Sequence, residues 1–152
     1  MSSALAAALR ELRAGGDYQR VLSAIPYAQF LGLQVSLEGE ALITRMPPAK
    51  RLIGNPVLPA LHGGTIGALL ETAAILELLR QTETERIPKP INVTVQYLRS
   101  ARVVETFARA EITRHGRRVA NVQVRAWQED EARPVAAAQT HFLLRSGEKS
   151  GV

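Results

Sequence analysis

Residues 62–81 read HGGTIGALLETAAILELLRQ, and they are the most informative stretch of the chain. Two adjacent glycines follow the first residue, no proline interrupts the stretch, and apolar residues then cover nearly every helical face. A helix that is apolar all round is a buried helix. The stretch therefore predicts one central helix from Gly63 to about Gln81, about 28 Å long at 1.5 Å per residue, which is enough to run through a small domain.

Shorter elements are indicated before this helix. Helical spacing of apolar residues predicts a helix over 3–13, and a second helix over 17–24 begins at an aspartate suited to capping. Two short strands, 33–37 and 41–46, are expected to form a hairpin around a Glu-Gly-Glu turn. Glycine and proline punctuate residues 51–61, which predicts an irregular loop.

After the central helix the apolar period changes to two, which is typical of strands. Three or four long strands are predicted, roughly over 91–99, 103–114, 118–129 and 134–145. Because short turns join consecutive strands, the pattern favours an antiparallel meander. The fold class is therefore α+β, with one long central helix packed against a single antiparallel sheet.

The chain has 152 residues, which is the size of one ordinary domain. We place that domain at 30–147, after an N-terminal helical extension over 1–29. The longest apolar stretch is interrupted by Glu71 and Glu77, and a membrane span needs about 18 consecutive apolar residues. The first basic residue follows the N-terminal apolar run, which is the reverse of a signal peptide. We therefore expect a cytoplasmic protein.

Composition limits the partners. The net charge of +5 and a pI near 10.2 favour an anionic partner. The basic residues are scattered and stacking aromatics are few, so a phosphorylated small molecule fits better than a nucleic acid. The absence of cysteine excludes disulfides, thiolate metal sites and cysteine nucleophiles.

Two common kinds of catalytic site are not indicated. No Gly-x-Ser-x-Gly elbow occurs, which argues against a serine hydrolase. The three histidines, His62, His115 and His141, lack a short ligand spacing, so we predict no metal site and no cofactor. We interpret His115 as a turn residue and His141 as structural.

Glu71 is the only charged residue between His62 and Leu76, on a helix otherwise suited to burial. Burying an unpaired carboxylate is costly, so its presence needs a reason. In one interpretation its head reaches solvent or pairs with an arginine such as Arg80 or Arg99. In the other, Glu71 is a catalytic base whose pKa is raised by apolar surroundings.

The turn His62-Gly63-Gly64 favours the second interpretation, because it begins the same helix. The first N–H groups of a helix have no internal partner and lie at the positive end of its dipole. They can donate to a carbonyl oxygen that gains negative charge during acyl transfer. Glycine lets such a carbonyl approach the backbone closely.

The segment from the turn to Glu71 resembles the signature of the PaaI-like hotdog-fold acyl-CoA thioesterases, which is His-Gly-Gly followed nine residues after the His by Asp or Glu. The resemblance spans roughly residues 30–145 and implies a hotdog fold, a sheet wrapped around one long helix. Further similarities are Tyr97-Leu98-Arg99, Gly116-Arg117-Arg118 and a closing strand at Ala136–Leu143.

The resemblance implies roles for individual residues. Glu71 would be the general base or the nucleophile, Gly63 would donate its N–H to the thioester carbonyl, and His62 would fix the loop or the substrate. Gly64 would contact the bound CoA. Asn55 resembles an amide residue upstream of the His in the family, although it lies seven residues before His62 where six are expected.

Family members also often place a hydroxyl near the catalytic centre. The matching positions here are Ile75 or Pro90, neither of which has one. Thr72 or Asn92 could take that place.

Arg99, Arg117 and Arg118 are predicted to hold the phosphates of CoA, because the planar fork of arginine donates two parallel hydrogen bonds. The expected partner is thus an acyl-CoA substrate, with no nucleic acid and no membrane. The expected assembly is a homodimer or homotetramer. Two other functions stay open, an acyl-thioester hydratase or dehydratase and a non-catalytic acyl-CoA-binding module.

The spacing also predicts that two subunits share each active site. His62 and Glu71 would lie about 13 Å apart along the helix and on opposite faces, at 3.6 residues per turn. One small carbonyl cannot contact both within a single chain. Two such helices packed antiparallel across a twofold axis would bring the start of each to the middle of the other.

Overall fold

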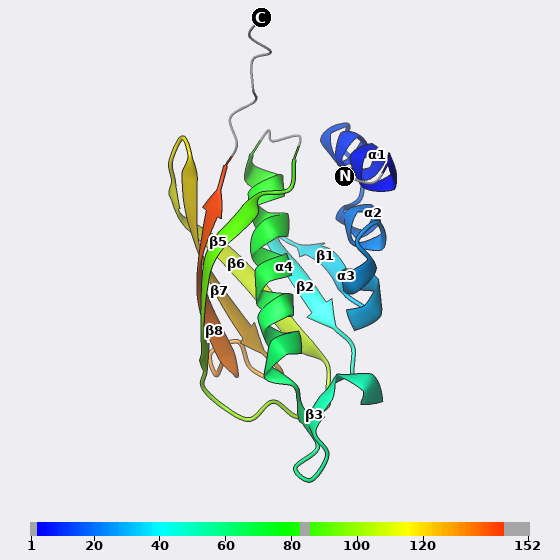
Figure 1. The fold of residues 1–152 in the computed structure, drawn as a ribbon, viewed down its shortest axis with the longest axis vertical. Coiled ribbons are helices and arrows are strands. Elements are labelled where there is room, and N and C mark those ends of the chain that lie inside the picture. Colours follow the sequence, from blue (N-terminus) through cyan, green and yellow to red (C-terminus); the bar gives the residue numbers. More distant parts are fainter. Residues whose placement is uncertain (1–2, 83–85, 145–152) are drawn as a thin grey trace, which may run out of the picture.

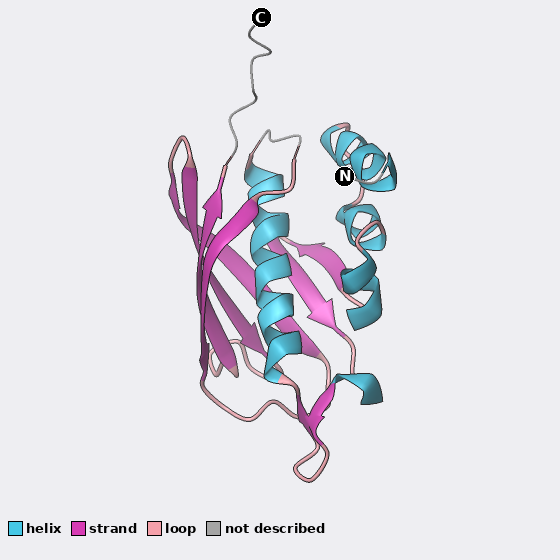
Figure 2. Ribbon diagram, viewed as in Figure 1, coloured by secondary structure: helices cyan, strands magenta, loops and turns pink. Residues whose placement is uncertain are grey.

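The computed structural model describes residues 3–82 and 86–144, which form an antiparallel sheet with a long helix on one face (Figure 1; Figure 2). The helix, α4 (Gly63–Gln81), has the bounds that the sequence predicts. Residue 145 of the predicted last strand and the predicted domain end at 147 lie outside the described residues.

The main sheet has six strands in the order β1-β2-β6-β7-β8-β5, and every neighbouring pair is antiparallel. The predicted hairpin and the four later strands are confirmed, with ends that differ by a few residues. The strands are β1 (Gln34–Glu38), β2 (Ala41–Met46), β5 (Lys89–Tyr97), β6 (Thr106–His115), β7 (Val119–Trp127) and β8 (Ala136–Leu143).

The predicted meander is wrong for β5. This strand lies at the edge of the sheet and pairs with β8, and not with β6, which follows it in sequence. The segment between β5 and β6, residues 98–105, is not a tight turn. It crosses below the start of α4 and is fastened there, because the Leu61 N–H donates to the Ala101 carbonyl at 2.9 Å.

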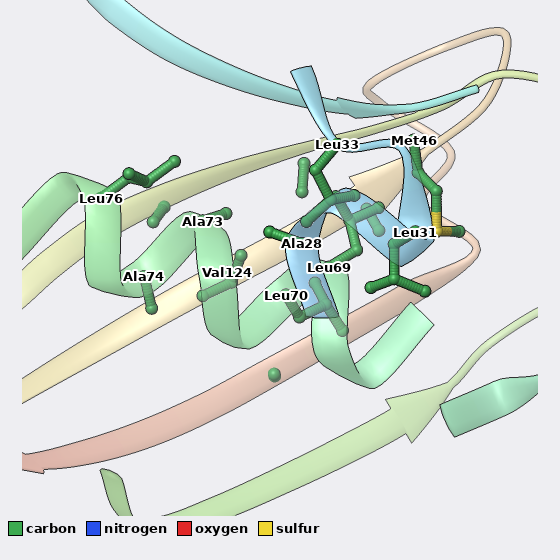
Figure 3. Packing of buried hydrophobic residues seen from close by; sticks show 14 of the residues in the cluster. Ala28, Leu31, Leu33, Met46, Leu69, Leu70, Ala73, Ala74, Leu76 and Val124 are labelled. Carbon is green, nitrogen blue, oxygen red and sulfur yellow. The ribbon is translucent and has the colours of Figure 1, made fainter. Parts of the chain in front are cut away.

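Small side chains on the sheet let α4 approach it closely. Alternate residues of β6, β7 and β8 face the helix, and many of them are alanine, among them Ala108, Ala126 and Ala136, which are fully buried. The leucines of α4 fill the space above them and join one continuous apolar core (Figure 3). This burial is the main stabilising term of the fold.

Three helices precede the sheet: α1 (Ser3–Arg13), α2 (Tyr18–Ser23) and α3 (Pro26–Leu31). The first two confirm the prediction, and the Asp17 side chain caps α2 by accepting from the Gln19 N–H at 2.8 Å. The helix α3 was not predicted; Pro26 occupies its first turn, where the missing N–H costs nothing. Leu31 of α3 belongs to the same core as α4 (Figure 3).

The predicted loop before α4 contains more structure than expected. It holds a short 3₁₀ helix at Lys50–Leu52 and a small hairpin, β3 (Ile53–Asn55) and β4 (Ala60–Leu61). This hairpin leads directly into the turn at His62, whose N–H donates to the Leu52 carbonyl at 2.8 Å.

One face of α4 is less buried than the rest. Gly67, Ala68, Glu71, Thr72 and Ile75 are half-buried, and helical spacing places them together on one side. We call these five residues the open stripe.

The strand β5 is also incompletely covered. It lies at an edge of the sheet, and its Ile91, Val93 and Tyr97 are exposed. The sheet wrapped around α4 is the hotdog architecture that the resemblance implies. No helix within residues 3–82 and 86–144 is long and apolar enough to cross a membrane.

Candidate active site

The turn at the start of α4 leaves one backbone donor available. His62 is the N-cap of the helix, and its Nδ1 accepts from the Gly64 N–H at 2.8 Å. The His62 carbonyl accepts from the N–H groups of Thr65 and Ile66 at 3.0 and 3.4 Å. Within the described residues no acceptor lies against the Gly63 N–H, so this group can bind an oxygen of a substrate.

His62 and Gly64 therefore fix the turn. The exposed imidazole folds back over the backbone, and a Cβ at position 64 would lie 3.0 Å from its Nδ1, which explains the glycine there. The Gly64 N–H is occupied by this cap, and the contact of Gly64 with CoA stays a prediction. Gly54 packs against His62 from the other side, where a Cβ would come within 2.6 Å of the His62 Cα.

Tyr97, at the end of β5, covers Gly63. A Cβ at position 63 would lie 3.1 to 3.2 Å from atoms of the tyrosine ring, so only glycine fits without displacement. The Tyr97 hydroxyl donates to the Gly63 carbonyl at 2.8 Å. This role of Tyr97 was not predicted, because a contact between a strand and a helix start 34 residues earlier leaves no local pattern in the sequence.

Glu71 lies on the open stripe, two turns further along α4. Burial raises the pKa of its carboxyl above the usual range, because desolvation disfavours the charged form. Among the described residues no cation pairs with it: Arg80 binds Glu77, and the guanidinium of Arg99 donates to the Pro134 carbonyl. The structure thus does not show an ion pair of Glu71 with Arg80 or Arg99, whereas the half-buried side chain agrees with the other part of that interpretation, in which its head reaches solvent.

Glu77 is a second carboxylate on α4 and is more deeply buried than Glu71, with only 4% of its surface exposed. It is fully paired, since Arg80 donates to it through Nε at 3.0 Å and Nη2 at 2.6 Å, and Gln81 adds a further bond. The spacing of Glu77 and Arg80, three residues apart on a helix, was a readable signal for this pair. Because Glu77 is held by Arg80 and Glu71 has no such cation among the described residues, Glu71 is the carboxylate of α4 that could react with a substrate.

The remaining predicted polar residues have local partners. The Asn55 side-chain oxygen accepts from the N–H groups of Val57 and Leu58 at 3.0 and 3.2 Å and thereby shapes the loop before His62. The Thr72 hydroxyl donates to the Ala68 carbonyl at 2.7 Å, as in many ordinary helices. Asn92 lies exposed on β5, 3.4 Å from the Thr94 hydroxyl.

The three predicted phosphate-binding arginines do not lie together within one chain. Arg99 follows β5, near the start of α4, and lines a hollow of about 210 Å³ together with Arg102 and Arg133. Arg117 and Arg118 belong to the hairpin between β6 and β7, which lies at the opposite end of the sheet (Figure 1). Arg102 and Arg133 were not predicted as part of this group, since only the fold brings them to Arg99.

Comparisons with known proteins agree with this geometry. The family described as the acyl-CoA thioesterase N-terminal domain matches residues 55–143, which include the turn and Glu71. No curated protein matches the sequence.

Solved structures also resemble the chain. A protein of Chromobacterium violaceum is 37% identical, with 94% of this chain and 98% of that chain covered and a TM-score of 0.71. A phenylacetic acid degradation-related protein of Ralstonia eutropha is 25% identical, with 85% and 100% covered and a TM-score of 0.70. A Bacillus halodurans protein solved with CoA is 20% identical, with 97% of each chain covered and a TM-score of 0.71.

Proposed function

Because the chain belongs to the acyl-CoA thioesterase family and is a thioester hydrolase, we propose that it cleaves an acyl-CoA-type thioester to the free acid and CoA at a site shared by two subunits. The observation that carries the proposal is a pair of groups on α4 with no partner among the described residues, the Gly63 N–H and the Glu71 carboxylate. The first can polarise a carbonyl and the second can act on water or on the carbonyl carbon.

The chemistry follows from these two groups. The thioester oxygen accepts from the Gly63 N–H at the positive end of the helix dipole, which stabilises the oxyanion of the tetrahedral intermediate. Glu71 either takes a proton from the attacking water or attacks the carbonyl carbon itself, which forms an anhydride that water then opens. In both routes the C–S bond breaks, the thiolate of CoA leaves, and one water molecule is consumed.

Distance requires the second subunit. Gly63 and Glu71 lie on the same less buried side of α4, but about 12 Å apart along its axis at 1.5 Å per residue. A base acts within about 3 Å of its target, directly or through one water. Separation along the axis, and not the opposite faces expected for His62 and Glu71, is thus the stronger argument for a shared site.

Gly67 supports a specific arrangement, because it lies midway between Gly63 and Glu71. Glycine inside a helix costs about 1 kcal/mol relative to alanine. Within one chain a Cβ at Gly67 would make only ordinary contacts, at 3.7 Å from the Tyr97 hydroxyl and 4.0 Å from Val95. A twofold axis at Gly67 would explain the glycine, since its missing side chain would let the partner's helix approach closely. It would also place Gly63 opposite Glu71 of the partner subunit.

The exposed edge strand β5 supports the same axis. Its outer backbone groups have no strand beside them in the described chain, and two copies of β5 could pair there to continue the sheet. The resulting homodimer is the smallest assembly with complete sites. A homotetramer and a cytoplasmic location stay predictions from the sequence.

The substrate class follows from the charge and the arginines. In an antiparallel dimer the β6–β7 hairpin of the partner, which carries its Arg117 and Arg118, would lie toward the end of the first chain that carries Gly63 and Arg99 (Figure 1). The net charge of +5 suits the phosphates of CoA. The CoA bound to the Bacillus halodurans protein is consistent with this assignment.

Replacing Arg99, Arg117 and Arg118 with glutamine is expected to raise KM for a CoA ester and to flatten its dependence on ionic strength, because the lost contacts are charge-assisted. KM for the corresponding pantetheine ester, which lacks the nucleotide phosphates, should not change. Glutamine at Arg10, Arg13 and Arg20 on α1 and α2 removes the same charge elsewhere and is the control. An unchanged KM for the CoA ester would place the phosphate site elsewhere.

The raised pKa of Glu71 predicts the pH profile. A base must be ionised to act, so kcat/KM should fall as the pH drops through the Glu71 pKa, which burial moves above the ordinary carboxyl value of about 4.3. The profile should therefore show an acid limb above that value. An acid limb at the ordinary value or below it would argue that a different, solvated carboxylate is the base.

A direct assay tests the function. Purified protein is incubated with short aliphatic, long aliphatic and aromatic CoA esters, and released thiol is followed with a thiol-detecting reagent. Hydrolysis of any ester above the spontaneous rate supports the proposal. Product without free thiol would indicate a hydratase, and binding without turnover would indicate a non-catalytic module.

A further inference from the structure

We infer that the hydroxyl groups of Thr65 and Tyr97 together fix the direction of the Gly63 N–H, and that the Thr65 hydroxyl also strengthens it as a donor. The inference rests on the proposed function, in which this N–H binds the thioester oxygen. Both residues act through the peptide backbone and do not touch the substrate carbonyl, so they are positioning residues.

Thr65 acts on the carbonyl of His62. Its side chain is buried, and its hydroxyl donates to the His62 oxygen at 2.7 Å. The same oxygen accepts two backbone N–H groups, at 3.0 and 3.4 Å. This carbonyl and the Gly63 N–H belong to one peptide unit. Hydrogen bonds to the oxygen of a peptide draw electron density from its nitrogen, so the N–H becomes a stronger donor.

Tyr97 acts on the next peptide unit. Its hydroxyl donates to the Gly63 carbonyl at 2.8 Å, and its ring lies against Gly63. The carbonyl before the free N–H is thus held by Thr65 and the carbonyl after it by Tyr97. The direction of the N–H is thereby fixed before substrate binds, which is the condition under which a donor lowers the barrier without reorganising.

The kinetic test removes each hydroxyl and keeps the carbon skeleton. Thr65→Val is expected to lower kcat about 5-fold with KM changed less than twofold, because a donor that acts on developing charge affects the transition state more than binding. The loss is smaller than the roughly 10²-fold cost of deleting such a donor. Thr65→Ser should restore kcat, and Tyr97→Phe should lower it by a similar factor.

Thr82→Val is the matched control. It deletes the same kind of hydroxyl-to-carbonyl bond, at 2.6 Å to Leu78, at the other end of α4. Its kcat should equal that of the wild type. If buried Thr65→Val does not fold, the exposed Tyr97→Phe and the hydroxyl-retaining Thr65→Ser still test the inference.

A second measurement needs no substrate. Labelling histidine at the carbonyl carbon and glycine at nitrogen selects two amides by NMR, His62–Gly63 and His115–Gly116. Loss of the Thr65 hydroxyl should move the Gly63 amide proton and the His62 carbonyl carbon upfield. The His115–Gly116 signals, whose N–H is bonded to the Val119 carbonyl at 2.9 Å, should stay in place.

The two measurements separate the two claims. A wild-type protein that hydrolyses no thioester contradicts the proposed function, and the NMR signals then decide whether Thr65 polarises the Gly63 peptide. Where hydrolysis is present, wild-type kcat in folded Thr65→Val and Tyr97→Phe overturns the inference. A rise in KM alone also overturns it, because that would indicate a role in binding.

Discussion

Replacing Glu71 with glutamine is expected to lower kcat at least about 10²-fold, the low end for loss of a positioned base. Glutamine keeps the size and a hydrogen-bonding head but can neither take a proton from water nor attack a carbonyl carbon. KM should change little, because the groups that bind CoA are untouched. Steady-state kinetics on the ester found by the CoA-ester assay measures both values.

A stability measurement separates lost chemistry from lost folding. Burial raises the pKa of Glu71, so ionisation of this group disfavours the folded state as pH rises through that pKa. Glu71→Gln should therefore unfold at the same or a higher temperature than the wild type at pH 7. The difference should disappear below the ordinary carboxyl pKa of about 4.3, where Glu71 is uncharged in both states.

The exposed Glu111→Gln on β6 removes a carboxylate with no proposed role and should leave kcat unchanged. Wild-type turnover in folded Glu71→Gln would reject the assignment of Glu71 as base or nucleophile.

The shared site predicts that two inactive chains can rescue each other. His62→Ala damages the turn and Glu71→Gln removes the carboxylate, so neither homodimer contains an intact site. A heterodimer of the two contains one undamaged turn facing one undamaged Glu71. Equal mixing through refolding makes about half of the dimers mixed, and we expect about a quarter of wild-type activity to return.

A double variant supplies the opposite control. A chain with both changes, refolded with an equal amount of wild type, forms mixed dimers in which neither site is complete. Activity should fall to about half of that of the wild-type chain present, whereas a site within one chain would leave it unchanged. Absence of rescue in the first mixture, with mixed dimers demonstrated by mass, would contradict the shared site.

The sequence predicted those elements whose signal is local. The bounds of α4, the helix α1, the Asp17 cap and the first hairpin all depend on residues within a few positions of one another. The strand β5 was recognised for the same reason, but its partner was not. Pairing with β8 joins residues 39 to 54 positions apart, and it is decided by how the sheet wraps around the helix.

The residues of the candidate site likewise fall into those that the sequence predicts and those that it does not. His62, Gly63 and Glu71 are readable because they fall within one helix and its cap. The bonds that occupy Asn55 are local, because they come from residues two and three positions later. The tyrosine that covers Gly63 and the separation of Arg99 from Arg117 (Figure 1) depend on packing between distant segments. No composition or periodicity in a single chain carries that information.

Under the proposed assembly, the outer edge of β5 makes both the activity and the solubility of the protein depend on dimerisation. In the described part of the chain no strand lies beside the outer edge of β5, and several of its apolar side chains are exposed. Such an edge is a template for pairing with other strands, so an isolated subunit is prone to aggregate. Under the proposed assembly, pairing of this edge with its copy both covers the aggregation-prone strand and completes the catalytic site. Variants whose subunits separate should then be insoluble and not inactive soluble monomers. Selection against aggregation would therefore preserve the shared site as effectively as selection for turnover.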